Sequence, residues 1–280
     1  MTTALTRLAG SAFEITLTVP WADVKKIYDQ VFDELAAEIE VEGFRKGKAP
    51  KDVISAKVDK SKIYGEVVNR ILPESYQNAL KEHGLKPIIS PKVQIASGEE
   101  DKDWQFIAKA SEKPIIDLGS YQDAIKTINA KGKIWTPNEP KKEEQDKQKK
   151  ISEIIDKLLQ VCKVELSELL VESEVNRLMA QLIDDVRQAG LTFEQYLGTK
   201  GETSEKLRQK YRLQAETALK LEFILDAIAD DLKIEITQKE IDNVIDKEVD
   251  PEKKKSLKDQ SYLLASMLRR EGTIDKLTAL

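Results

Sequence analysis

From Lys141 onward, apolar residues recur every three or four positions, and mostly polar or charged residues lie between them. This spacing predicts amphipathic α-helices, each burying one stripe of side chains. Charged residues make up 34% of the chain, above the usual quarter, which favours long helices with much exposed surface. We therefore expect residues 141–280 to form an all-α domain of stacked antiparallel helices. Two of the stripes are Ile151, Ile154, Ile155, Leu158, Leu159 and Cys162, and Val171, Val175, Leu178, Met179, Leu182, Ile183 and Val186.

The first 113 residues follow another pattern. Apolar and polar residues alternate over 13–19, around 93–95 and over 104–110, which predicts three strands. Helical spacing covers 21–40 and 62–83, and Gly84 is suited to cap the second helix because glycine readily adopts the left-handed conformation. These elements predict an α+β domain with a small antiparallel sheet and long helices.

Between the two halves, the stretch Pro114–Pro140 has no clean apolar period and is interrupted by glycine and proline residues. We interpret it as a linker. At 280 residues the chain is long enough for two domains, so we expect residues 1–113 and 141–280 to form them, in a molecule that is elongated overall.

Residue types that carry common chemistry are scarce. Cys162 and His83 are the single cysteine and the single histidine, which excludes an internal disulfide and makes a zinc site or a Ser-His-Asp triad improbable. Cys162 lies on an apolar stripe and is expected in the core. Neither GxxxxGK[ST] nor GxGxxG after a strand is present, so we expect no nucleotide, cofactor, metal or catalytic residue.

The sequence also bears on membranes. No apolar run approaches 18 residues, and the N-terminal stretch lacks the order of a signal peptide. We expect a cytoplasmic protein without a membrane partner.

One loop stands out between the two N-terminal helices. It contains an aromatic residue between glycines, followed by basic residues, in the stretch EGFRKGKAPK from Glu42 to Lys51. From Gly43 to Lys62, seven Lys and Arg residues face only Asp52 and Asp59, although the whole chain has a net charge of −5. The loop is either an ordinary helix connection with solvated lysines or an exposed docking finger, in which Phe44 is an apolar anchor and Arg45 a bidentate clamp.

The stretch GFRKGKAP resembles the ribosome-docking signature of the trigger factor family of bacterial chaperones. Further stretches resemble the family in order, and together they cover almost the whole chain. They are LKPIISP from Leu85, KPIIDLGSY from Lys113, VESEVNRL from Val171, GLTFEQYL from Gly190 and IADDLKIEIT from Ile228.

The resemblance implies an ATP-independent chaperone that docks near the exit tunnel of the large ribosomal subunit, on a ribosomal protein and on rRNA, and shields nascent or unfolded polypeptides. It also admits a weak homodimer. The implied ribosome-binding residues are Gly43, Phe44, Arg45, Lys46, Gly47 and Lys48. The client-binding residues that we expect in the helical domain are Leu219, Leu221, Phe223, Ile224, Leu225 and Met267, for which a place in the helix core is an equal alternative.

The chain departs from the family at three places. The family usually carries an FKBP-like prolyl isomerase domain between its two parts, and such a domain needs roughly 100 residues, which Pro114–Pro140 cannot supply. Ser167 stands where the family commonly has proline, and the match weakens after about Lys247. Three alternatives remain open: a ribosome-independent holdase of the SurA type, a prolyl isomerase, and a simple RNA-binding module.

Overall fold

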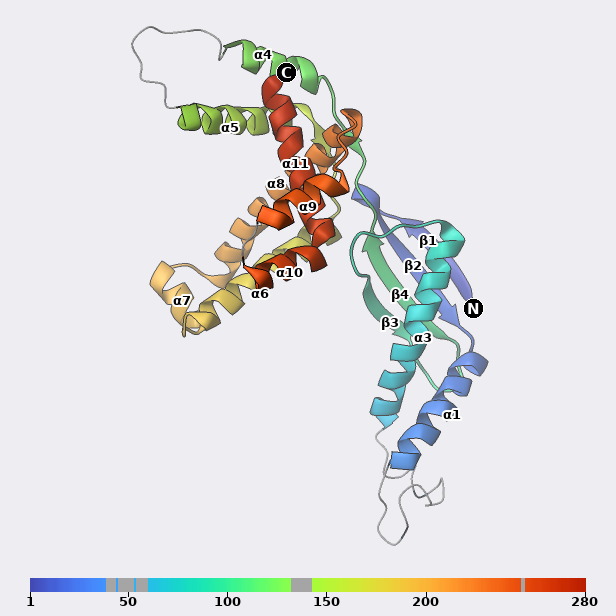
Figure 1. Ribbon diagram of the computed structural model, residues 1–280. Coiled ribbons are helices and arrows are strands. Elements are labelled where there is room, and N and C mark those ends of the chain that lie inside the picture. The colour runs from blue at the N-terminus through green and yellow to red at the C-terminus, as the bar shows by residue number, and fades with distance from the viewer. Residues whose placement is uncertain (39–43, 45–52, 54–59, 132–142, 248–249) are drawn as a thin grey trace. The chain divides into compact units, whose positions relative to one another are not determined.

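The structure, a computed structural model, describes residues 1–38, 44, 53, 60–131, 143–247 and 250–280 (Figure 1). The chain divides into two compact units, Met1–Lys113 (unit 1) and Pro114–Leu280 (unit 2). Unit 1 combines a sheet with helices, and unit 2 is helical except for one short strand pair. The predicted fold class is therefore confirmed within each unit, whereas the elongation of the whole molecule stays a prediction.

Unit 1 is built on a four-stranded antiparallel sheet in the order β1-β2-β4-β3. The strand β2 confirms the alternation seen over 13–19, and β3 and β4 confirm the other two predicted strands. The sequence reasoning missed β1, which pairs with β2 over six residues without a break. The strands are β1 (Thr2–Arg7), β2 (Ala12–Val19), β3 (Lys92–Ser97) and β4 (Trp104–Ser111).

Two helices, α1 (Trp21–Glu38) and α3 (Lys60–His83), pack on one face of this sheet. The alternation in β2 and β4 explains the arrangement, because every second side chain of a strand points to the same face. That face carries Phe13, Ile15 and Leu17 from β2 and Phe106 from β4, all fully buried. The helix α3 runs through Pro73 as one element, and Gly84 follows it with φ of +64°, as predicted for a capping glycine.

Unit 2 begins with a part that we predicted as a linker. Residues 116–131 instead form β5 (Ile116–Asp117) and α4 (Tyr121–Lys131), so the linker prediction is wrong there. The physical reason is that Tyr121 and Ile125, one helical turn apart, are both buried in the core of unit 2. The rest of the predicted linker, 132–140, lies outside the described residues.

The other elements of unit 2 follow the predicted helical spacing. Strand β6 pairs antiparallel with β5, and residues 251–279 form two helices, α10 and α11. The elements are α5 (Glu143–Val161), β6 (Lys163–Val164), α6 (Glu168–Gln188), α7 (Phe193–Lys200), α8 (Ser204–Asp231), α9 (Gln238–Lys247), α10 (Pro251–Asp259) and α11 (Ser261–Ala279).

Helix starts in unit 2 follow local capping chemistry. Thr192 and Gln195 form a capping box, with both of its hydrogen bonds present, at the start of α7. Thr237 and Glu240 form a variant of the capping box before α9. The backbone amide and the hydroxyl of Thr237 both donate to the Glu240 carboxylate, at 2.7 and 2.8 Å. These hydrogen bonds, led by that from the Thr237 amide, hold the pKa of Glu240 below its usual value.

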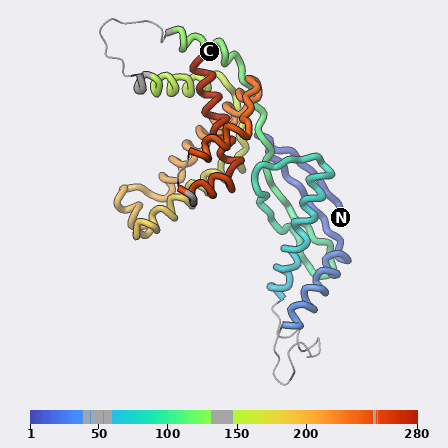
Figure 2. The backbone as a smooth tube through the Cα atoms, viewed as in Figure 1, coloured from blue at the N-terminus to red at the C-terminus, as the bar shows by residue number. Residues whose placement is uncertain are grey.

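The C-terminal end of α11 is held in the core of unit 2, beside α4 (Figure 2). Leu277 is fully buried, and its carbonyl accepts a 2.9 Å hydrogen bond from Nδ2 of the buried Asn129. Lys150 of α5 donates to the carbonyl of Thr278 at 2.9 Å. Side chains from α4 and α5 thus satisfy carbonyls of the last turn that have no partner within the helix.

Candidate functional site

The predicted docking residues fall almost entirely outside the described residues. Gly43, Arg45, Lys46, Gly47 and Lys48 lie there, and their docking role stays a prediction. Phe44 is described, and its side chain is 46% exposed. An exposed phenylalanine in a basic segment is available as an apolar anchor, whatever surface it meets.

The helices on either side of this loop are tied together. Arg70 of α3 donates to both carboxylate oxygens of Glu34 on α1, at 3.0 and 2.6 Å, and to Glu66 one turn earlier on α3, at 3.1 Å. The hydrogen bonds from Arg70 lower the pKa of Glu34. The pair is solvent-exposed and adds little to stability, and its bidentate geometry links α1 to α3.

The predicted client-binding residues on α8 are mostly core residues. Leu219, Phe223, Ile224 and Leu225 are buried, and Leu221 is half-buried. Ile224 and Leu225 pack in the same cluster as Ile125 of α4. The C-terminal half of the helix packs in a core, which favours the helix-core alternative for these residues, and their client-binding role stays untested.

An exposed apolar surface lies on α11, where Met267 is the only member of the predicted set. Leu263, Met267, Ile274 and Leu277 share one helix face, since they are spaced by four, seven and three residues. Leu277 and Ile274 pack in the core, whereas Met267 is 60% exposed and Leu263 is 55% exposed. The apolar stripe of α11 therefore continues beyond the part of the helix that the core covers.

Tyr262, which precedes Leu263 in the chain, is 90% exposed. We call Tyr262, Leu263 and Met267 the α11 patch. The sequence reasoning missed Tyr262 and Leu263, because it followed the more apolar α8. The sequence of α11 could have identified these residues, because this helix has more apolar residues than one buried stripe needs.

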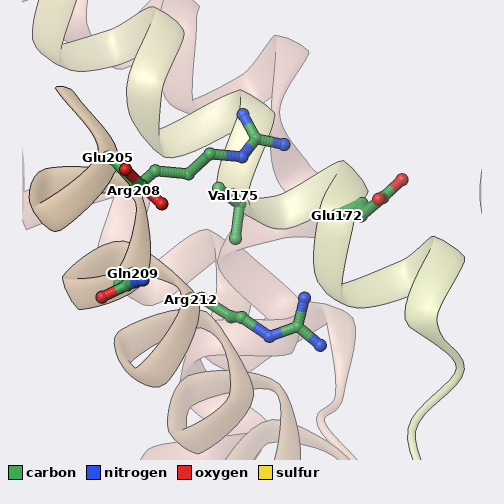
Figure 3. Close-up of a pocket in the computed structure, with 6 residues that line it drawn as sticks. All are labelled: Glu172, Val175, Glu205, Arg208, Gln209 and Arg212. Atoms are coloured by element: carbon green, nitrogen blue, oxygen red, sulfur yellow. The ribbon is translucent and has the colours of Figure 1, made fainter.

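A cleft of about 260 Å³ lies along the seam between α6 and α8 (Figure 3). Arg208 and Arg212 extend from α8 toward α6, with Val175 between them, and Glu172, Glu205 and Gln209 complete the lining. Arg208 donates a 3.3 Å hydrogen bond to the neutral side chain of Asn176. The lining mixes both signs of charge and carries no histidine or cysteine.

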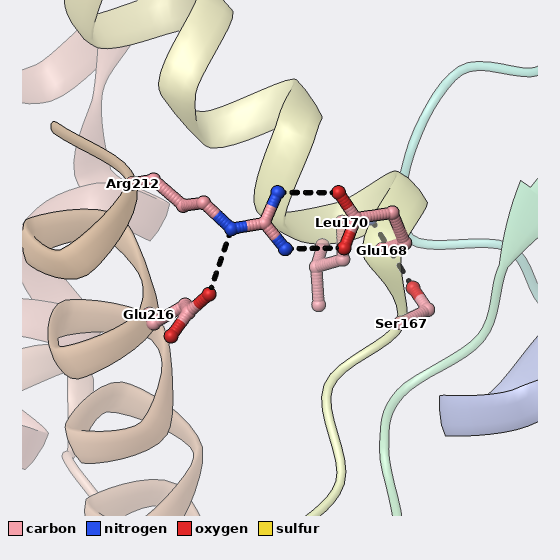
Figure 4. A network of polar contacts seen from close by, with 5 residues as sticks. All are labelled: Ser167, Glu168, Leu170, Arg212 and Glu216. Atoms are coloured by element: carbon pink, nitrogen blue, oxygen red, sulfur yellow. Dashed lines mark hydrogen bonds and ion pairs between the residues drawn. The ribbon is translucent and has the colours of Figure 1, made fainter. Parts of the chain in front are cut away.

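A polar network closes the same seam at the start of α6 (Figure 4). Arg212 donates two 2.5 Å hydrogen bonds to the Glu168 carboxylate and a 3.1 Å bond to Glu216, and these carboxylates raise the pKa of its guanidinium. The buried Ser167 accepts a 3.2 Å hydrogen bond from the Leu170 amide. Serine at this position therefore starts α6 as an N-cap, so the departure from the family's usual proline is compatible with the helix.

Two buried titratable groups have altered pKa values. Burial, with a smaller contribution from Asp117, raises the pKa of the Cys162 thiol to about 11. Its Sγ donates to the Leu118 carbonyl at 3.4 Å, which places the residue in the core as predicted. Burial and a hydrogen bond to Asp231 raise the pKa of Tyr121 to about 12. Neither group is ionised near neutral pH, so neither is an activated nucleophile or base.

The described part of the chain has neither a metal-ligand cluster nor a membrane-spanning helix. Within it, no group of three or more His, Cys, Asp or Glu residues is placed to hold a metal ion. No helix there is long and apolar enough to cross a membrane.

Two family models match the chain. The model of the bacterial trigger factor protein matches residues 1–148, and the model of the C-terminus of that protein matches residues 131–279. Their matched ranges overlap, so together they extend over nearly the whole chain.

Curated relatives agree with these matches. The trigger factor of Streptococcus agalactiae serotype Ia is 31% identical over 134 residues, which are 48% of this chain and 31% of the relative. The trigger factor of Corynebacterium glutamicum strain R is 31% identical over 130 residues, which are 46% of this chain and 29% of the relative. The trigger factor of Streptococcus uberis is 30% identical over 148 residues, which are 53% of this chain and 35% of the relative. The matched part of the chain thus spans about a third of the length of these relatives.

A solved structure described as "Promiscuous Substrate Recognition in Folding and Assembly Activities of the Trigger Factor Chaperone" has the same fold. The TM-score is 0.69 at 14% identity, and the similarity covers 100% of this chain and 99% of that one. At this identity the similarity speaks for the fold alone, and the family models carry the assignment. The chain belongs to the trigger factor family.

Proposed function

We propose that this chain is an ATP-independent chaperone of the cytoplasm, which docks near the exit tunnel of the large ribosomal subunit and shields nascent polypeptides. Family membership supports the class of function. The observation that carries the proposal within the structure is the α11 patch, an apolar surface left open on a helix that is otherwise packed into a core. Exposed apolar patches commonly mark interaction sites.

The α11 patch suits clients of varied sequence. Met267 has a flexible, polarisable side chain that adapts to different apolar partners, and Tyr262 adds a large ring with a polar end. A patch of three residues makes weak contacts, so a client is released without nucleotide. Tethering at the exit tunnel raises the effective concentration of the patch near an emerging chain, which compensates for the low affinity.

Docking is assigned to the loop that contains Phe44. In the proposed mechanism Phe44 inserts into an apolar notch, Arg45 and Lys46 pair with carboxylates or RNA phosphates, and Gly43 and Gly47 let the loop turn. The ion pair between Arg70 and Glu34 supports this role, because it links α1 and α3, the helices that precede and follow this segment.

We further propose that the chain has no prolyl isomerase activity of its own. The two family models meet and overlap at residues 131–148, which leaves no separate stretch between them for a domain of roughly 100 residues. The function would then rest on binding alone.

Two measurements with the full chain test the proposal. Purified protein should cosediment with ribosomes at moderate salt, and at equimolar amounts it should delay aggregation of a chemically unfolded client without ATP. Cosedimentation is expected for a ribosome-docked chaperone but not for a holdase of the SurA type. Unchanged client aggregation at several-fold excess of protein would exclude the chaperone function.

A further inference from the structure

We infer that the outer edge of β3 in unit 1 binds an extended polypeptide segment, which adds to the sheet as a fifth strand. The inference rests on the proposed function for the source of the segment, an unfolded client chain. The binding site itself is argued from the geometry of the sheet.

The sheet has two edges, and they differ. At the β1 edge, the core-facing side chains are all engaged. The Thr3 hydroxyl donates to Glu82 at 2.9 Å and lies 2.9 Å from Nε2 of His83, at the end of α3. Leu5 packs against the core, and Arg7 pairs with Glu112. Side chains of α3 and of the segment after β4 therefore contact the β1 edge.

Within the described part of unit 1, the β3 edge lacks this cover. Val93 and Ile95 lie opposite the buried Ala108 and Phe106 of β4, so their side chains belong to the core-facing side of the sheet. Ile95 is nevertheless 56% exposed, and Val93 is only half-buried. The core of unit 1 thus ends in an open apolar margin along β3.

Backbone chemistry defines what can cover this margin. Among the described residues no strand pairs with the outer side of β3. In an antiparallel pair, alternate residues of an edge strand direct both N–H and C=O away from the neighbouring strand. An extended polypeptide matches this row of donors and acceptors, and every second side chain of it would meet Val93 and Ile95. A helix has no free row of backbone groups, so it fits the edge poorly.

The site is short. The register of β3 against β4 shifts between Ile95 and Ser97, and such irregularities limit pairing with further strands. The regular part of the strand, Lys92–Ile95, can therefore hold only a few residues of a client. Such brief pairing favours rapid release and protects the edge from open-ended aggregation.

The test uses a labelled peptide of about nine residues, with alternating valine and threonine between terminal lysines. Its binding to the full-length protein is measured by fluorescence anisotropy, and amide hydrogen exchange is followed by NMR. We expect alternate amides of β3 to become protected on peptide addition, while the amides of β1 do not change. A peptide with N-methyl groups at alternate residues, which lacks those donors, should not bind at β3.

Two matched variants locate the site. Ile95→Lys places a charge on the core-facing side of the edge and should weaken peptide binding at β3 by at least about 10-fold, because an extended apolar segment would then bury that charge. Gln94→Lys introduces the same charge at the neighbouring exposed residue, on the opposite face of the sheet, and should leave binding within about 2-fold. Circular dichroism of both variants checks that the fold is kept.

The other outcomes overturn the inference. Equal binding by the N-methylated peptide, protection at β1 instead of β3, or equal effects of the two variants would each exclude strand addition at β3. Protection of β3 that rises with protein concentration in the absence of peptide would identify a second copy of the chain as the occupant. If client aggregation is not delayed but the peptide still protects β3, the chaperone proposal fails and the strand-addition site remains.

Discussion

The hydroxyl of Tyr121 donates a 2.5 Å hydrogen bond to Oδ2 of Asp231, joining the first residue of α4 to the last residue of α8. Gln122 donates to the same oxygen at 3.3 Å. Because the Tyr121 ring is also buried beside Ile125, this contact fixes α4 in unit 2 immediately after the boundary with unit 1.

Removal of the hydroxyl should therefore destabilise unit 2. We expect Tyr121→Phe to lower the free energy of unfolding by about 1–2 kcal/mol, since a hydrogen bond to a charged acceptor is lost while the ring stays buried. Urea unfolding followed by circular dichroism measures the change. Tyr262→Phe, at a fully exposed tyrosine, is the matched control and should have no effect. Equal stability of the two variants would contradict the role of this contact.

Stability should fall in alkaline solution. The pKa values of Cys162 and Tyr121 are raised in the folded protein, to about 11 and about 12. The unfolded chain therefore loses these protons first as the pH rises, so the free energy of unfolding decreases from about pH 9 upward. Cys162→Ala should remove the part of this slope between about pH 9 and 11. A slope unchanged in this variant would show that the thiol is not responsible.

The α11 patch should be needed for holding clients. Replacing Leu263 and Met267 together with serine removes exposed apolar surface, so suppression of client aggregation should require several-fold more protein. Glu271→Ser, at an exposed charged residue of the same helix, is the control. Thermal unfolding should move little in all of these variants, because surface changes usually stay within about 0.5 kcal/mol. Full activity of the double variant would assign client binding to another surface.

The loop containing Phe44 should carry ribosome docking. Burial of a phenylalanine side chain contributes roughly 1.5 to 3 kcal/mol, so Phe44→Ala should weaken ribosome binding by about 10- to 100-fold. Changing Phe44, Arg45 and Lys46 together to alanine should abolish cosedimentation at moderate salt. Wild-type binding should weaken as salt is added, because the basic residues act through screened charge. If the triple variant cosediments with ribosomes as well as the wild type does, the segment is an ordinary connection between helices and not a docking site.

An isomerase assay tests the remaining proposal. The full chain should not accelerate a proline-limited peptide reaction above background, because the matched family regions leave no room for the FKBP-like fold. A known isomerase in the same assay is the positive control. Acceleration that a point mutation of this chain abolishes would contradict the proposal.

Local patterns predicted most elements of the fold. Alternation located β2 and β4, and the spacing of apolar residues located the long helices, because each element buries one face. The strand β1 was missed because Thr2–Arg7 is largely exposed and polar, and only its pairing with β2 makes it a strand. The helix α4 was missed because glycine and proline residues on both sides concealed the short period of Tyr121 and Ile125.

The candidate site was harder to predict than the fold. Apolar character alone does not distinguish a core helix from a binding surface, so Phe223 and Ile224 were grouped with Met267 although only the last is exposed. The difference depends on which helices surround each residue, and this is a property of tertiary packing. The docking residues were inferred from a contiguous stretch of sequence, and their role stays a prediction because all of them except Phe44 lie outside the described residues.

The hydrogen bond between Asn129 and the Leu277 carbonyl connects residues 148 positions apart in the chain. Contacts of such long sequence separation slow folding, because much chain entropy is lost before they form. During synthesis α4 emerges long before α11, so Ile125 and Leu158 must wait for the last helix before their cluster is complete. We conclude that this cluster reaches its native packing only after α11 has been made.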